Sequence, residues 1–400
     1  MSTQSIIEFQ EFVSPVKQEK FLLGIIEGYT EVDPASLGID SVFSPRAIWE
    51  VAVDDPYVAT RSAEEQMEVH AAEVGADNYA RKRREMGYWE RKPDTAYVTE
   101  EGQEAHKDAW GDPESRERFF SSLNNKAISL WQEQVIPSAK ALAYLSDPNA
   151  FEVVESLDGA QQEEMDEATR KWFSLCTDAV GIRSRATILS EAVKNYIDIT
   201  VEEGSNPNEL RWMSIACGTA LPTIKAAVSA KVSPKMHLVD WNVDAMNDAY
   251  SLAEELDFKG EMKQHRANIF EPRHMSLLKQ KLESSGDLPD VIDMMGIFEY
   301  AGENINIDPA VFLRSCYDFL KPGGRLIFGQ MRSDRPLPDF TMGVVSWPFI
   351  HMRSPSEIMN VVRDAGILPE QARLFLPKDD VYAVGVIDKP SLDSKIIPTS

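Results

Sequence analysis

The sequence predicts an α/β protein of the doubly wound type, preceded by a mainly α-helical N-terminal domain. Three observations predict it: short apolar runs alternate with helical patterns in the second half, a turn of small residues follows the first run, and an acid ends the second. We expect strands at 211–216, 236–240, 263–267, 290–295, 325–331, 371–376 and 381–387. Helices fit between them at 220–231, 242–256, 272–284, 308–320 and 355–365.

The end of the predicted sheet has its own pattern. Only Pro377 to Asp380 separate the last two strands, which is too short for a crossover helix. These strands are therefore expected to form an antiparallel hairpin at the edge of the sheet. The longer connections elsewhere predict parallel strands with helices on both faces.

Helical patterns dominate residues 1–165. The stretch from Ser62 to Arg84 is charged and rich in helix formers. A second helix is expected over 121–145, where the apolar residues share one face. The segments 30–60 and 88–116 are rich in Pro, Asp, Gly and Tyr, and they predict loops between helices.

These patterns divide the chain into three parts. We expect an α-helical domain over 1–165, an α/β core over 166–390 and a flexible tail over 391–400. The helical domain contains no catalytic motif. By analogy with other architectures, it would form a lid, a substrate-binding cap or a homodimer interface.

The composition restricts the class of partner. Hydrophobic residues make up 43% of the 400 residues and charged residues 26%, which suits a globular protein. The formal net charge is −24, which disfavours nucleic acid and anionic membrane as partners. The basic clusters at 81–84 and 91–92 predict a solvated helical face.

The cysteines and the N-terminus indicate the compartment. Cys176, Cys217 and Cys316 lie far apart, with neither metal-site nor disulfide spacing, so we expect no metal and a reducing environment. The N-terminus lacks the pattern of a signal peptide, and no apolar run is long enough to span a bilayer. The sequence therefore predicts a cytoplasmic protein.

The segment from Arg211 to Ala220 is the most informative in the chain. An apolar run enters a tight turn of small residues, and the next apolar run ends in Asp240. Asp240 lies 22 residues beyond Gly218 (240 − 218). This layout is typical of a nucleoside-cofactor site at the first switch point of a doubly wound sheet.

These residues, together with the Pro-Gly-Gly turn at 322–324, resemble the class I S-adenosylmethionine-dependent methyltransferases over about 210 positions. The loop after the first strand looks like that family's Asp-x-Gly-x-Gly-x-Gly motif. Ser214 replaces the acid, and Ala216 and Ala220 replace two of the glycines. The resemblance implies a Rossmann-like seven-stranded methyltransferase core with S-adenosyl-L-methionine as its cofactor.

The resemblance also implies a set of cofactor-binding residues. Small loop residues would let the backbone approach the methionine part of the cofactor, an acid would accept hydrogen bonds from the ribose, and apolar and amide groups would face the adenine. A further pair would lie beneath the sulfonium. The residues implied are Ala216, Cys217 and Gly218 in the loop, Asp240 at the ribose, Trp241, Asn268 and Ile269 near the adenine, and Met295 and Gly296 beneath the sulfonium.

A narrower resemblance covers about 179–388. The segments 179–185 and 296–300 look like those of a poorly characterised bacterial methyltransferase family with Gly-Ile-Arg-x-Arg and Gly-Leu-Tyr-Glu motifs. It would bring Arg183 and Arg185 to the mouth of the cofactor site. It implies no particular substrate.

Three residues are candidates for catalysis. Glu299 and Tyr300 follow the fourth predicted strand of the core, where the acceptor would meet the cofactor, and His351 lies before the last helix. Glu299 would act as a general base if the acceptor is a hydroxyl or an amine. The alternative interpretation gives each of the three a structural role.

The function expected from these features is direct SN2 transfer of a methyl group to a small-molecule acceptor. Three alternatives remain open at this point. They are a nicotinamide-dependent oxidoreductase, an S-adenosylmethionine-using enzyme of other outcome such as a lyase or a propylamine transferase, and a non-catalytic adenosyl-ligand-binding or scaffold protein.

Overall fold

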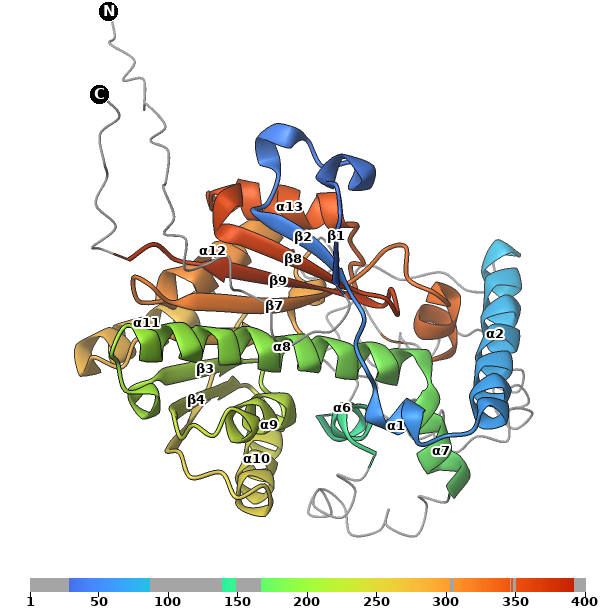
Figure 1. Ribbon diagram of the computed structural model, residues 1–400, viewed down its shortest axis with the longest axis horizontal. Coiled ribbons are helices and arrows are strands. Elements are labelled where there is room, and N and C mark those ends of the chain that lie inside the picture. The colour runs from blue at the N-terminus through green and yellow to red at the C-terminus, as the bar shows by residue number, and fades with distance from the viewer. Residues whose placement is uncertain are drawn as a thin grey trace, which may run out of the picture.

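One nine-stranded sheet forms the centre of the protein, in a computed structural model that describes residues 29–86, 139–148, 167–302, 306–345, 347 and 350–391. The strand order is β1-β2-β8-β9-β7-β6-β3-β4-β5 (Figure 1). The strands are β1 (Tyr29–Glu31), β2 (Ala47–Val51), β3 (Arg211–Ile215), β4 (Lys235–Asp240), β5 (Met262–Arg266), β6 (Val291–Met294), β7 (Arg325–Met331), β8 (Ala372–Pro377) and β9 (Tyr382–Asp388). Only β1 and β9 run against the other strands.

The seven strands predicted for the second half are confirmed, each within one residue of its expected bounds. The predicted hairpin is also confirmed, since β8 and β9 are antiparallel. Strand β9 lies between β7 and β8 and pairs with both. The hairpin is not at the edge of the sheet, however, because β2 pairs with the outer side of β8.

The prediction of loops over 30–60 is wrong where β1 and β2 form. Strand β2 runs parallel to β8, and Ile48 and Val51 are buried against the core. The ring of Trp49 packs 5.2 Å from that of Phe375 on β8. Strand β2 has five residues, and its partners are the three-residue β1 and the distant β8. Its formation therefore depends mainly on a distant segment, which a local pattern does not contain.

Helices cover both faces of the core sheet. One layer consists of α8 (Thr177–Glu202), α9 (Leu221–Ser229) and α10 (Val243–Glu255), and the other of α11 (Pro272–Ser285), α12 (Pro309–Phe319) and α13 (Pro355–Asp364). Each layer packs its apolar side chains against the sheet in a separate buried cluster. The expected helices are confirmed. The sequence also has a helical pattern over 185–199 that leads into the sheet, and α8 covers this range but begins earlier, at Thr177.

Local sequence explains where the core helices begin. The side chain of Asn242 accepts hydrogen bonds from the second and third residues of α10, both at 3.1 Å. Asp308 caps α12 in the same way, and Ser354 forms a reciprocal capping box with Glu357 at the start of α13. These caps fix the helix starts beside the carboxyl ends of the strands.

The described N-terminal segments form α1 (Pro56–Ala59), α2 (Ala63–Glu85), α6 (Ala139–Ser146) and α7 (Glu167–Leu175). Helices α2, α6 and α7 gather around the first turns of α8, and their apolar side chains share a third buried cluster with it (Figure 1). The helix expected over 121–145 is described only from residue 139, and the loop expected over 88–116 and nearly all of the tail lie outside the described residues.

A buried arginine ties these segments to the core. Arg183 on α8 pairs with Asp55 through Nε at 2.7 Å. Its other nitrogens donate to the carbonyl oxygens of Leu145, Phe173 and Ser174 at 3.0, 3.1 and 2.6 Å. The Arg183 side chain thus supplies hydrogen-bond donors to the backbone carbonyls at the carboxyl ends of α6 and α7. It also holds Asp55, the residue that caps α1.

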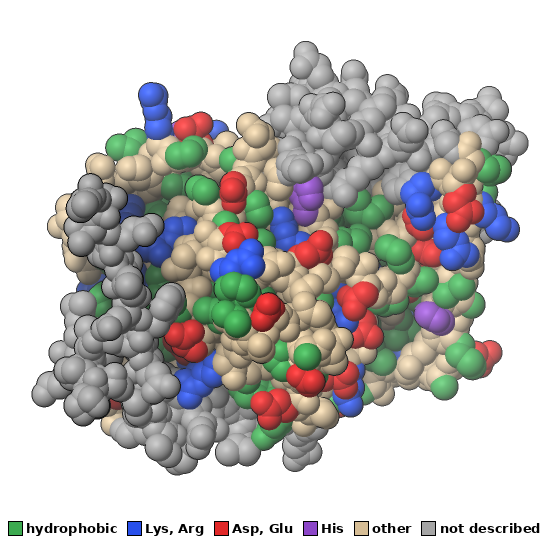
Figure 2. Space-filling model, turned by 90° about the horizontal axis from the view of Figure 1, so that it is seen from above, with side chains coloured by type: hydrophobic (Ala, Val, Ile, Leu, Met, Phe, Trp, Pro, Cys, Tyr) green, Lys and Arg blue, Asp and Glu red, His purple; other side chains and the backbone are tan. Residues whose placement is uncertain are grey.

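Charges of both signs are interspersed over the face shown in Figure 2. Arg81 to Arg84, part of the predicted basic cluster, lie in the last turns of α2. All three arginines of this cluster have partners. Arg81 donates to Asn78, Arg83 donates to the Tyr79 hydroxyl at 3.2 Å, and Arg84 pairs with Asp339. Within the described part of the chain, no helix combines the length and apolarity that crossing a membrane requires.

The first prediction concerns Arg183→Met. It leaves the Asp55 carboxylate and three carbonyls without their buried donor, so we expect the free energy of unfolding to fall by about 3–5 kcal/mol. Urea denaturation measures it. Lys259→Met is the matched control, because Lys259 pairs with Asp257 at the exposed surface and its loss should cost below about 1 kcal/mol. Equal losses in the two variants would contradict the anchoring role of Arg183.

Candidate functional site

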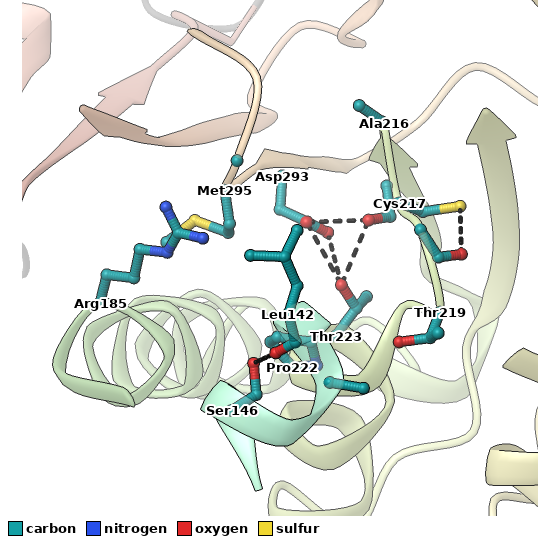
Figure 3. Close-up of a pocket in the computed structure, with 14 residues that line it drawn as sticks. Leu142, Ser146, Arg185, Ala216, Cys217, Thr219, Pro222, Thr223, Asp293 and Met295 are labelled. Atoms are coloured by element: carbon teal, nitrogen blue, oxygen red, sulfur yellow. Dashed lines mark hydrogen bonds between the residues drawn. The ribbon is translucent and has the colours of Figure 1, made fainter. Parts of the chain in front are cut away.

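The sheet has a topological switch point at β3, where successive strands change the direction in which they extend the sheet. From β3 the chain adds β4 and β5 toward one edge, whereas β6 and β7 follow on the other side of β3. Ligands of open α/β sheets bind outside the carboxyl ends of the strands at such a switch point. A hollow of about 550 Å³, counting its open mouth, lies there (Figure 3). It is lined by Leu142, Ala143, Ser146, Arg185, Ser214, Ala216, Cys217, Gly218, Thr219, Pro222, Thr223, Asp293, Met295 and Gly296.

The loop after β3 forms one wall of this hollow. Ala216, Gly218 and Ala220 alternate along it, and all three have left-handed backbone conformations, with φ of 50°, 51° and 52°. Two of these residues are alanines, for which this conformation is uncommon and costs free energy. The surrounding structure therefore holds the loop in a conformation that its own sequence does not favour, as is common at functional sites.

Asp240 fastens this loop to the next strand. One carboxylate oxygen accepts a hydrogen bond from the backbone N–H of Gly218 at 2.8 Å, and the other accepts from Asn242 at 2.9 Å. Burial raises the pKa of Asp240, while these backbone donors favour its charged form. The carboxylate predicted to meet a ribose is therefore held at the end of β4, beside the loop.

The nine residues expected to bind the cofactor divide into two groups. Ala216, Cys217, Gly218, Met295 and Gly296 line the hollow. Asp240, Trp241, Asn268 and Ile269 lie outside its lining, at the ends of β4 and β5.

Three of the residues outside the hollow differ in exposure. The Trp241 side chain is 53% exposed, so its ring is free to cover a ligand. The Asn268 side chain is exposed, and its oxygen accepts a hydrogen bond from the backbone of Phe270 at 3.0 Å. Ile269 is buried in the apolar cluster against which Ala216 packs.

Cys217 lines the hollow as an unreactive thiol. Burial raises its pKa well above the usual value, and the nearby carboxylates of Asp240 and Asp293 raise it further. A thiol must ionise to act as a nucleophile. Cys217 therefore contributes shape and polarisability to the wall rather than chemistry.

Asp293 is a residue of the site that the sequence analysis missed. It lies on β6 directly opposite Ser214 of β3, the position at which the resembled motif has an acid. Its carboxylate accepts hydrogen bonds from Ser214 Oγ at 2.9 Å and from Trp212 Nε1 at 2.7 Å. Thr223 Oγ1 on α9 lies 3.2 Å from both carboxylate oxygens. The signal that could have found it is an acid inside an otherwise apolar strand run.

The structure separates the two arginines of the narrower resemblance. Arg183 does not line the hollow, whereas Arg185 does. The Arg185 guanidinium lies 4.3 Å from the Tyr382 ring centre, and its Nη1 lies 3.5 Å from Glu299 Oε1. A Cβ on Gly296 would lie 3.4 Å from Nη2, so Arg185 packs closely along that part of the wall.

The three candidate catalytic residues are brought together, but none lines the hollow. Glu299 and Tyr300 belong to the short helix η8 (Phe298–Tyr300), and the backbone N–H of His351 donates to the carbonyl of Glu299 at 2.7 Å. Glu299 is fully buried, which raises its pKa, while Arg185 opposes that shift. The Tyr300 hydroxyl accepts a hydrogen bond from Trp347 Nε1 at 2.5 Å.

Helix α6 contributes to the site in a way that no local sequence pattern predicts. Leu142, Ala143 and Ser146 on this helix line the hollow. Figure 3 labels Leu142 and Ser146 in this wall. The carboxyl end of α6 is fastened by Asp147, which accepts hydrogen bonds from Tyr57 and from Lys225 of α9. An N-terminal segment thus closes one side of the hollow.

Comparisons with known proteins give similarity at low identity. No protein-family model matches the chain, and no curated protein matches it. A solved structure described as a possible exported protein from Bordetella parapertussis has 14% identity and a TM-score of 0.49, covering 85% of this chain and 100% of that one.

Two further solved structures carry methyltransferase names. An O-methyltransferase family protein from Burkholderia thailandensis has 16% identity and a TM-score of 0.36, covering 61% of this chain and 71% of that one. Magnesium protoporphyrin IX methyltransferase from Synechocystis PCC 6803, with bound SAH, has 10% identity and a TM-score of 0.36. The match covers 62% of this chain and 97% of that one. Because these identities and TM-scores are low, the function is argued from the geometry of the site.

The second prediction concerns the left-handed loop. Ala216→Gly relieves the strained φ, so we expect the free energy of unfolding to rise by about 0.5–1 kcal/mol. The same substitution at Ala72, an exposed position in the middle of α2, should lower it by about 1 kcal/mol. Chemical denaturation of both variants measures the opposite signs. A loss of stability in Ala216→Gly would show that the loop has another conformation.

Proposed function

We propose that this chain is an S-adenosylmethionine-dependent methyltransferase that acts on a small-molecule acceptor. The observation that carries the proposal is the hollow at the switch point, bounded by a strained small-residue loop that Asp240 fastens to the next strand. The sequence motifs that resemble those of the class I methyltransferases, in the loop after β3 and at Asp240, support the same function.

The residues present fit an S-adenosyl ligand. The left-handed loop leaves its wall free of bulky side chains, since Ala216, Cys217 and Gly218 line the hollow there. Asp240 lies at the carboxyl end of β4, where each oxygen retains a lone pair beside its backbone donor. The exposed ring of Trp241 follows directly and would cover the adenine.

When bound, S-adenosylmethionine supplies a methyl group on an electrophilic sulfonium, so the reaction asks the protein mainly for alignment and exclusion of water. The loop after β3, together with Met295 and Gly296, would hold the cofactor's reactive end. Leu142 and Ala143 of α6 would exclude water from that side. We propose that the N-terminal segments serve as a lid in this sense.

The acceptor would lie near η8. Glu299, Tyr300 and His351 meet there, and we propose that Glu299 accepts a proton from a hydroxyl or amine acceptor. Burial raises the pKa of Glu299 toward the range in which a carboxylate exchanges protons efficiently. Arg185 would hold the charged form in place through its ion pair.

The alternatives differ in what they require of the loop. A nicotinamide-dependent oxidoreductase would use Gly-x-Gly-x-x-Gly, which this loop lacks. In a non-catalytic scaffold nothing would require the loop to keep an unfavourable backbone conformation, whereas Ala216 and Ala220 keep the costly left-handed conformation.

We also propose a reducing, cytoplasmic location, since Cys176, Cys217 and Cys316 are free thiols.

The experiment that tests the proposal is calorimetric titration of the full chain with S-adenosylmethionine and S-adenosylhomocysteine, with NAD and NADP as controls. Micromolar binding of the adenosyl ligands without nicotinamide binding supports it. No binding of either adenosyl ligand contradicts it. A mass-spectrometric screen for acceptors that gain one methyl group then separates methyl transfer from lyase or propylamine chemistry.

The third prediction concerns Asp240→Ala. Two hydrogen bonds to the ribose, worth about 1–1.5 kcal/mol each, would be lost, so S-adenosylhomocysteine should bind more than tenfold more weakly. Calorimetry measures the affinity. Asp244→Ala is the control, because Asp244 is exposed on α10 four residues further along the chain. Unchanged affinity in Asp240→Ala would remove the ribose role.

The fourth prediction concerns Glu299→Gln. Because a base works only when deprotonated, wild-type turnover should fall as the pH drops through the raised pKa of Glu299. The variant should lose this acid limb and about 10²-fold in turnover, with affinity for S-adenosylhomocysteine within about twofold. Glu370→Gln, at an exposed position, is the control. Full activity of Glu299→Gln would discard the role as base.

A further inference from the structure

Two histidines face each other inside the protein, and neither of them lines the hollow. His237 on β4 is fully buried, and His265 on β5 is 8% exposed. Their rings are stacked, with centroids 5.1 Å apart and an interplanar angle of 21°. His237 Nδ1 lies 2.9 Å from His265 Nε2, so this histidine pair shares one hydrogen bond across two neighbouring strands.

The histidine pair lies where the edge of the sheet is attached to the core. Strand β5 is the edge strand and pairs with β4, and His265 is the one buried residue among its five. His237 alternates with Val239 on β4, so the pair is on the face that α11 covers with Leu278 and Leu282. The packing of β5 against the core therefore depends mainly on the ring of His265.

The charged groups around the pair oppose a further positive charge. Lys235 on β4, Lys263 on β5 and Lys281 on α11 lie near it. The acid near it is Asp287, which follows α11 and already pairs with Lys235 at 2.7 Å and with Arg211 at 3.2 Å. Burial first, and then the neighbouring positive charges, lower the pKa of both imidazoles to about 4. Both rings are therefore neutral at pH 7.

Protonation of the pair has a defined structural consequence. A hydrogen bond between two imidazoles needs a lone pair on one of the facing nitrogens, so when both rings are charged an N–H faces an N–H. His237 Nε2 is buried without a hydrogen-bond partner among the described residues, so a proton added there meets no acceptor. The packed pair therefore excludes protons that the same rings would accept in water.

We propose that the histidine pair is an acid-sensitive switch, which holds β5 and α11 on the sheet while both rings are neutral and releases them when the rings take up protons. Asp240 and Asn268 lie three residues beyond His237 and His265 (240 − 237 and 268 − 265). Release would therefore separate the two strand ends that would meet the nucleoside. The switch itself goes beyond the proposed function, and only this effect on the ligand rests on it.

The pH window of the switch follows from the linkage between protonation and opening. An imidazole in water has a pKa of about 6.5, whereas the pKa of each packed ring is lowered to about 4. Between these values the open state binds more protons than the closed state, so the closed state loses stability as the pH falls through this window. Above the window both states are neutral, and the closed state keeps its full advantage.

Hydrogen exchange of the full chain, followed by mass spectrometry of its peptides, measures this opening without any ligand. Protection factors correct for the intrinsic pH dependence of exchange. We expect the protection of β5 and α11 to fall by more than about tenfold from pH 7 to pH 5. Strand β9, which lies inside the sheet, should keep its protection. Unchanged protection of β5, or an equal loss in β9, would overturn the switch.

A double variant removes the titrating groups and keeps two stacked rings. In His237→Phe with His265→Phe, the protection of β5 should change by less than about twofold between pH 7 and pH 5. His274→Gln is the matched control, because the exposed His274 on α11 accepts a hydrogen bond from the backbone N–H of Asn268 at 3.1 Å, just beyond β5. The acid-induced loss should persist in this control. Loss of the pH dependence in His274→Gln instead of the double variant would overturn the role of the pair.

Nuclear magnetic resonance of the wild-type chain decides the question even if the double variant does not fold. The two buried imidazoles should titrate below about pH 5, and the amide signals of β5 should change over the same range. Signals of β5 that stay unchanged while the two rings titrate would overturn the switch.

Calorimetry with S-adenosylhomocysteine separates the switch from the proposed function. From pH 7 to pH 5 the affinity should fall at least about tenfold more in the wild type than in the double variant. Asp240 is present in both proteins, so its own titration does not contribute to this difference. Equal pH dependence in the two proteins would overturn the link between the switch and the nucleoside. Absence of binding at pH 7 would contradict the proposed function, whereas the exchange measurement would still decide the switch.

Discussion

The buried carboxylate of Asp293 is the constraint on which the switch point depends. It joins β6 to β3 through Trp212 and Ser214, and β3 to the first turn of α9 through Thr223. The loop between β3 and α9 has both ends fixed by this one side chain. The left-handed conformations of Ala216 and Ala220 persist because the elements on either side of the loop are held together. The backbone preference of the two alanines alone would favour another conformation.

Most of the core could be predicted from the sequence because its signals are local. Apolar runs of strand length, Gly and Pro at the turns and capping residues at the helix starts all act within a few residues. Strand β2 has no such signal. Its five residues form a strand because β8, more than 300 residues later, presents open backbone groups and Phe375 packs on Trp49.

The residues of the candidate site also differ in whether local sequence or contacts between distant segments determine their place. The loop at 216–218 and the acid at Asp240 were predictable from their spacing, and the structure joins them by a hydrogen bond. Asp293, Arg185 and the α6 residues that line the hollow depend on which strands and helices become neighbours. The roles of Glu299, Tyr300 and His351 remain predictions, although the structure brings them together around η8.

Strand β2 also protects the rest of the sheet. Strand β8 is buried along its whole length, and without β2 it would present a row of open N–H and C=O groups beside apolar side chains. Such an edge is a template for pairing with another molecule. Residues 47–51 therefore protect the chain against aggregation, and their loss would appear first as concentration-dependent self-association of a chain whose remaining sheet can still form.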